Sequence, residues 1–98
     1  MILSVGIYAQ DTIDINNLHS DEIAGFKLYP NPAAADVVYV ITDKNNLKDV
    51  RVYDVFGELV LTDRLSTKAM NISKLSPGVY VVQVTENGKS ITRKLVVK

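Results

Sequence analysis

Close to its end the chain reads SPGVYVVQVTENG over residues 76–88, where two turn signals enclose an apolar, strand-like run. Pro77 fixes its own backbone angle and Gly78 tolerates unusual ones, so this pair turns the chain directly before the run. Asn87 and Gly88 form the strongest hairpin signal in the sequence, because both tolerate the positive φ angles of a type I′ turn. We therefore expect a strand between the two signals, followed by a tight turn into a final strand.

The run at residues 79–85 is apolar on nearly both of its faces. Alternate side chains of a strand point to opposite sides of its sheet. One side carries Tyr80, Val82 and Val84, and the other carries Val79, Val81 and Gln83. This pattern predicts a central strand with one face in the core and the other covered by a neighbouring element or by a partner protein.

Short strand-like segments separated by turn signals continue outward from this run, and no helical period is sustained. Such spacing is typical of a β-sandwich rather than of a helix bundle. The predicted strands span residues 26–29, 36–42, 49–54, 58–62, 69–72, 79–85 and 91–97. A chain of 98 residues buries enough surface for one core only, so we expect a single folded domain.

Two further turns are predicted upstream. The YPNP motif at residues 29–32 cannot continue a strand ladder, because its two prolines lack N–H donors and favour extended conformations before them. The DVFG motif at residues 54–57 predicts a tight hairpin in which its glycine has a positive φ. The residues to which we assign structural turn roles are Tyr29, Pro30, Asn31, Pro32, Asp54, Gly57, Asn87 and Gly88.

The chain offers little catalytic chemistry. It has no Cys, and its one histidine, His19, falls in a predicted linker, which disfavours a Ser-His-Asp site and metal sites that need several His or Cys ligands. Carboxylates at strand ends could bind calcium, but no calcium-loop motif is present and Asp is common in turns. We therefore predict no enzymatic activity, no cofactor and no metal.

Charge is distributed unevenly although the formal net charge is zero. Residues 1–25 contain four acids and no Lys or Arg, whereas residues 89–98 contain four cations and no acid. Four cations spread along a strand are typical of a solvated face, and nucleic-acid binders carry larger basic patches, so nucleic-acid binding is not expected.

The aromatic side chains could form a sugar-binding platform, but there is no Trp and most of them occupy alternating strand positions. Packing in the core and at its rim is the better interpretation. It applies to Phe26, Tyr29, Tyr39, Tyr53, Phe56 and Tyr80.

The N-terminal part divides into two segments. Residues 1–10 are apolar with a small residue near a plausible cleavage point, which indicates a signal-peptide-like remnant or, alternatively, an accidental apolar strand. This stretch is shorter than the roughly 20 residues that a membrane-spanning helix needs, so no stable membrane span is expected. Residues 11–25 form an acidic linker, and residues 26–98 form the sandwich domain.

Four motifs, in this order, resemble those of the C-terminal sorting domain of the type IX (Por) secretion system of Bacteroidetes. They are YPNP at residues 29–32, DVFG at 54–57, the trio Leu75, Gly78 and Tyr80, and KLVVK at 94–98. The resemblance covers about residues 26–98 and implies an all-β fold, a small immunoglobulin-like antiparallel β-sandwich of about seven strands. It also implies a signal that carries an attached cargo from the periplasm to the cell surface or the medium. Since no large cargo precedes the domain, we expect either a fragment or a small product that is mostly tag.

The partners implied by the resemblance are the outer-membrane translocon and a sortase-like peptidase that cuts upstream of the domain, within residues 16–25. We expect the domain itself to be a monomer. Translocon recognition is assigned to Pro77, Gly78, Tyr80, Lys94, Leu95, Val96, Val97 and Lys98. Of these, Leu95 and Val97 are expected to pack inward, whereas lysines on an edge strand either are recognised or protect the edge from pairing. The alternative function is that of a cell-surface adhesion or carbohydrate-binding immunoglobulin-like module.

Overall fold

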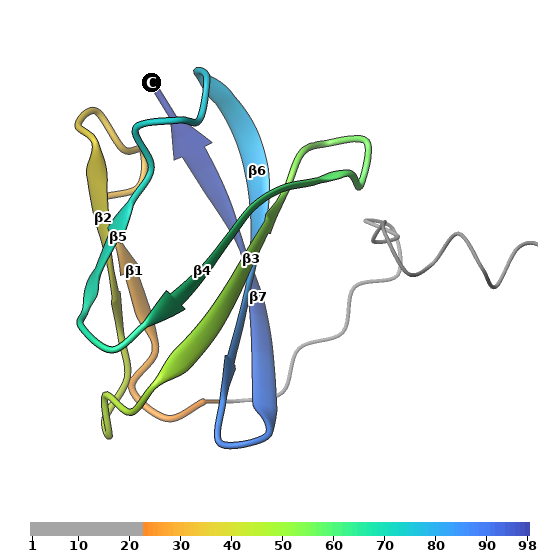
Figure 1. Ribbon diagram of the computed structural model, residues 1–98. Coiled ribbons are helices and arrows are strands. Elements are labelled where there is room, and N and C mark those ends of the chain that lie inside the picture. The colour runs from red at the N-terminus through yellow and green to blue at the C-terminus, as the bar shows by residue number, and fades with distance from the viewer. Residues whose placement is uncertain (1–22) are drawn as a thin grey trace, which may run out of the picture.

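A computed structural model describes residues 23–98 of the chain, which fold into two antiparallel β-sheets packed face to face (Figure 1). The smaller sheet has the order β1-β2-β5 and contains β1 (Lys27–Tyr29), β2 (Val37–Ile41) and β5 (Ala69–Asn71). The larger sheet has the order β4-β3-β6-β7 and contains β4 (Leu59–Leu65), β3 (Lys48–Tyr53), β6 (Gly78–Glu86) and β7 (Lys89–Val97). The all-β sandwich of seven strands is therefore confirmed.

All seven predicted strands are present, and their bounds differ from the prediction by at most three residues. The largest difference is at the end of β4, which continues to Leu65 rather than ending at residue 62. Asp63 and Arg64 resemble a polar loop in sequence. In the structure they remain paired with β3, and the Arg64 Nε atom lies 3.3 Å from the Asp49 Oδ1 atom on the neighbouring strand.

The core lies between the two sheets and is built from alternate residues of the strands. Its fully enclosed side chains are Val38, Val40, Met70 and Ile72 on the smaller sheet side and Val50, Val52, Val82, Val84, Ile91 and Leu95 on the larger sheet. The central position of β6, predicted from its two apolar faces, is confirmed because β3 and β7 pair with it on either side.

The folded part begins earlier than the linker boundary predicted at residue 25. The Ile23 side chain is buried in the core, and the Ala24 carbonyl accepts a hydrogen bond from the Asp43 amide at 3.0 Å. A single apolar residue in a polar stretch has no period that could reveal its burial. The signal-peptide-like segment, His19 and the linker up to residue 22 lie outside the described residues.

Two hairpin turns have the backbone geometry that their sequences favour. Gly57 has a φ of 85°, and the Asp54 carboxylate accepts hydrogen bonds from the Phe56 amide at 2.9 Å and the Glu58 amide at 3.0 Å. Asn87 and Gly88 have φ values of 51° and 81°, the left-handed pair of a type I′ turn. These two turns fix the registers of β3 with β4 and of β6 with β7.

Candidate functional site

The candidate recognition site is β7, an edge strand of the four-stranded sheet. Leu95 and Val97 of this strand point into the core, as expected from the sequence. Lys94 and Lys98 are exposed and Val96 is half-buried, since these three residues alternate with the buried ones. The strand therefore contributes to folding with one face and presents Lys94 on the other, and Lys98 directly follows its end.

The free backbone edge of β7 is occupied by the YPNP segment. The Asn31 Nδ2 group donates to the Lys94 carbonyl at 2.8 Å, and the Val96 amide donates to the Asn31 Oδ1 atom at 2.9 Å. The side-chain amide of Asn31 thus bonds the edge as a neighbouring strand would.

Ala33 continues this covering of the β7 edge. The Ala33 amide donates to the Val96 carbonyl at 2.7 Å, and the Lys98 amide donates to the Ala33 carbonyl at 2.8 Å. Figure 1 shows the end of β7 beside the connection from β1 to β2, which contains these residues. A partner therefore cannot add a strand to this half of β7 without displacing residues 31–33, so binding by strand addition is disfavoured here.

The remaining residues assigned to recognition lie at the same end of the sheet but differ in exposure. Gly78 pairs with Val97, which places the turn before β6 next to the end of β7. Tyr80 is buried, and its hydroxyl donates to the Ser76 carbonyl at 2.6 Å. This hydrogen bond stabilises the turn before β6. Pro77 is exposed. Only part of the sequence-assigned set is therefore accessible to a partner.

Lys94 and Lys98 have no acidic partner among the described residues. The ion pairs found in this part of the chain join Lys48 to Glu86 and Arg64 to Asp49. The two ammonium groups are therefore exposed and unpaired with any acid of residues 23–98, which leaves them available to an acidic partner.

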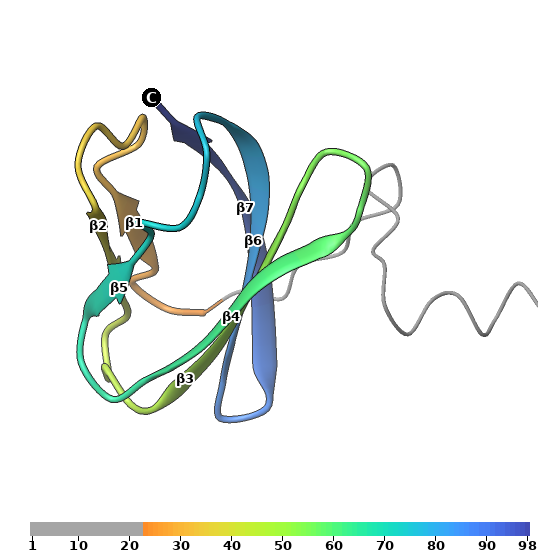
Figure 2. The ribbon, with the colours of Figure 1, turned by 45° about the horizontal axis from the view of Figure 1, so that its top comes forward.

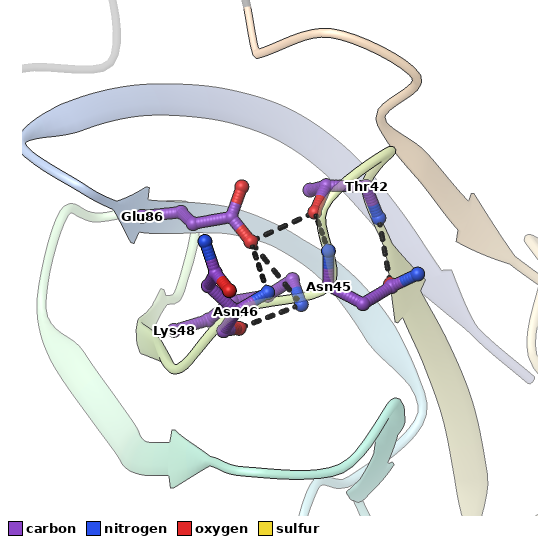
Figure 3. Close-up of polar contacts among 5 residues, drawn as sticks. All are labelled: Thr42, Asn45, Asn46, Lys48 and Glu86. Atoms are coloured by element: carbon purple, nitrogen blue, oxygen red, sulfur yellow. Dashed lines mark hydrogen bonds and ion pairs between the residues drawn. The ribbon is translucent and has the colours of Figure 1, made fainter.

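Sequence reasoning missed a buried polar cluster at the opposite end of the sandwich (Figure 3). The Glu86 Oε2 atom accepts hydrogen bonds from the Thr42 hydroxyl and the main-chain amide of Asn46, both at 2.8 Å. The same oxygen lies 3.6 Å from the Lys48 Nζ atom. The Lys48 ammonium also donates to the Asn46 carbonyl at 3.1 Å. The burial of Lys48 could have been predicted from the sequence, because alternation places its side chain on the same face as Val50 and Val52.

This cluster has a structural role. Every buried side-chain nitrogen and oxygen in residues 23–98 has a hydrogen-bond partner. In the same residues, no three His, Asp or Glu side chains lie close enough to share a metal ion. The hydrogen bonds tie the connection between the two sheets to the end of β6.

The secretion system C-terminal sorting domain family matches residues 27–98. The chain therefore belongs to this family, and the domain is a C-terminal sorting signal for type IX secretion, which exports proteins to the cell surface or the medium. A comparison with curated proteins finds no match. In the described residues, no helix has the length and apolar character needed to cross a membrane.

Replacing Asn31 tests the covering of the β7 edge. We expect Asn31→Ala to lower the free energy of unfolding by about 1 kcal/mol, because two exposed hydrogen bonds are lost. Hydrogen exchange measured by NMR should become faster at the Val96 amide. The Lys98 amide is the internal control, since its bond to Ala33 remains. Unchanged exchange at Val96 would contradict the assigned role of Asn31.

Proposed function

We propose that the type IX translocon recognises this domain through the exposed side chains at the end of β7, above all Lys94 and Lys98. Both lysines are exposed and have no acidic partner in residues 23–98. Lys94 belongs to β7, whose other face is anchored in the core, and Lys98 directly follows this strand. The exposure of these two charges, one on the edge strand β7 and one directly after its end, is the observation that carries the proposal.

We further propose that a sortase-like peptidase cuts the chain between residues 16 and 22. This narrows the range expected from the sequence, because residues 23–25 are part of the folded domain. Proteases act on extended, accessible backbone, and a buried Ile23 disfavours cleavage beside it. We also infer that the domain acts as a monomer and catalyses no reaction itself, in keeping with its family's role as a sorting signal.

An export assay tests the role of the two lysines. The fusion consists of a signal peptide, a fluorescent protein and residues 21–98, expressed in a Bacteroidetes host that has the translocon. We expect the intact fusion to reach the surface or the medium, and Lys94→Ala/Lys98→Ala to reduce export several-fold. Deletion of residues 94–98 should abolish export, but it also removes Leu95 and Val97 from the core, so the double substitution is the decisive variant.

A matched control separates the effect of removing Lys94 and Lys98 in particular from the effect of removing any two positive charges. Lys44→Ala/Lys89→Ala removes the same number of exposed cations elsewhere on the domain, and we expect its export to equal that of the intact fusion. Thermal melting of the purified domains should show that both double variants remain folded. Equal export of the intact fusion and the Lys94/Lys98 variant would refute recognition through these lysines, and failure to export the intact fusion would refute the sorting function.

A further inference from the structure

The outer face of the four-stranded sheet is divided into a polar half and an apolar half. In the polar half, two rows of cross-strand neighbours run across all four strands. The rows are Arg64, Asp49, Thr85 and Ser90, followed by Thr62, Arg51, Gln83 and Thr92. A face of this kind, with interspersed charges and hydroxyls, is the ordinary solvated side of an antiparallel sheet.

The next rows on the same face are apolar. Leu59, Tyr53, Val81 and Lys94 are cross-strand neighbours on β4, β3, β6 and β7, and Val79 and Val96 form the row beyond them. We call Tyr53, Leu59, Val79, Val81 and Val96 the outer-face patch. Tyr53 and Val81 are buried although they lie outside the core between the sheets, so they form the floor of the patch. Leu59 and Val79 remain 39% and 42% exposed.

The hairpin between β3 and β4 adds further exposed apolar surface. Val55, Phe56 and Val60 belong to this hairpin, and Phe56 is 87% exposed, so the expectation that it packs in the core or at its rim is wrong. In Figure 2 the loop joining β3 to β4 extends away from the smaller sheet. Exposed apolar side chains thus continue along the chain from the patch residues Tyr53 and Leu59 into the hairpin, and exposed apolar patches mark protein interaction sites.

The charges on this half of the face point to the kind of partner. Lys94 is the cross-strand neighbour of Val81, and Lys98 follows Val96 at the same spacing, so the two lysines flank the patch. No carboxylate lies in these rows, whereas Asp49 lies between Arg51 and Arg64 in the polar half. The complementary surface therefore has apolar side chains at its centre and carboxylates on the side that faces Lys94 and Lys98.

We propose that the outer-face patch, flanked by Lys94 and Lys98, is the surface on which a protein of the export machinery docks, through an apolar contact bordered by carboxylates. The proposal rests on the sorting function and assigns a surface to it. Because Asn31 and Ala33 occupy the edge of β7, docking uses this face of the sheet rather than strand addition. The second apolar face of β6, expected from the sequence to be covered by a neighbour or a partner, is part of this surface.

Site-specific photo-crosslinking tests the surface in the export fusion described above. A benzoylphenylalanine replaces Leu59, or, as the matched control, Thr62, which is exposed on the same strand and the same face but in the polar half. Irradiation of cells during export should give an adduct from position 59 that mass spectrometry assigns to a translocon protein. The same adduct should be absent from position 62.

Export of substituted fusions provides a second, independent measurement. Leu59→Thr/Val79→Thr removes apolar surface, but threonine is β-branched and favours strands. We therefore expect several-fold lower export with an unchanged melting temperature. Thr62→Ala/Gln83→Ala, in the polar half, should be exported like the intact fusion.

Two adducts would overturn the proposal: one joining two copies of the chain, and one formed equally from position 62. Normal export of the Leu59/Val79 variant would overturn it while leaving the sorting function intact. Failure of the intact fusion to be exported would remove the sorting function and this proposal together, so the two failures are distinguishable.

Discussion

Replacing Lys48 by methionine is expected to destabilise the domain by about 3–5 kcal/mol, because it leaves the carboxylate of Glu86 buried without its counter-charge. Lys48 is 1% exposed and Glu86 is 5% exposed, so water cannot take the place of the lost ammonium. Methionine has a similar length and fills the space, which confines the effect to charge and hydrogen bonding. A loss of this size is a large fraction of the 5–15 kcal/mol that stabilises a typical domain.

The second substitution in a double-mutant cycle separates charge from packing. Glu86→Gln in the Lys48→Met background removes the unpaired charge, while the amide oxygen can still accept from Thr42 and Asn46. We expect the double variant to recover much of the lost stability, measured by urea unfolding followed by circular dichroism. Lys44→Met is the control, since Lys44 is exposed on the connection that leads from β2 to β3. This substitution should change the free energy of unfolding by less than about 0.5 kcal/mol. A cost below about 1 kcal/mol for Lys48→Met would show that the ammonium is not enclosed.

Truncation of Leu95 to alanine is expected to cost about 2–5 kcal/mol, because its side chain is fully buried in the core and its removal leaves a cavity. The neighbouring substitution Lys94→Ala is the matched control. Lys94 points to the opposite, exposed face of the same strand, so its removal should change the free energy of unfolding by less than about 0.5 kcal/mol.

This pair of variants separates the two roles of β7. Leu95→Ala should impair export only to the extent that it lowers the folded fraction, which unfolding curves measure directly. Lys94→Ala should impair export while the domain stays folded. A cost below about 1 kcal/mol for Leu95→Ala would mean that β7 does not close the core and that the recognition strand is held in some other way.

The strands and turns were predictable because their causes act over a few residues. Alternation along residues 79–85 placed Val82 and Val84 in the core and made β6 a central strand. Asn87 with Gly88, and Gly57 with the carboxylate of Asp54, close turns whose geometry depends on neighbouring residues. The family resemblance rested on motifs of the same local kind.

Other features depended on contacts between residues far apart in the chain. Asn31 bonds Lys94 and Val96 across 63 and 65 positions, and no local pattern shows that a turn motif will cover the edge of the last strand. Lys48 meets Glu86 because β3 and β6 pair in the larger sheet, and no pattern within either strand shows this pairing. Ile23 completes the core from a stretch that reads as linker.

The outer-face patch shows where local information ends. Alternation indicates that Tyr53 and Arg51 share a face of their strand. It does not show that Arg51 belongs to the polar half of that face and Tyr53 to the apolar half. Strand order and register bring Leu59, Tyr53 and Val81 into one row and place Lys94 beside them. Side-chain alternation is a property of one strand, whereas a binding surface forms only when pairing aligns several strands.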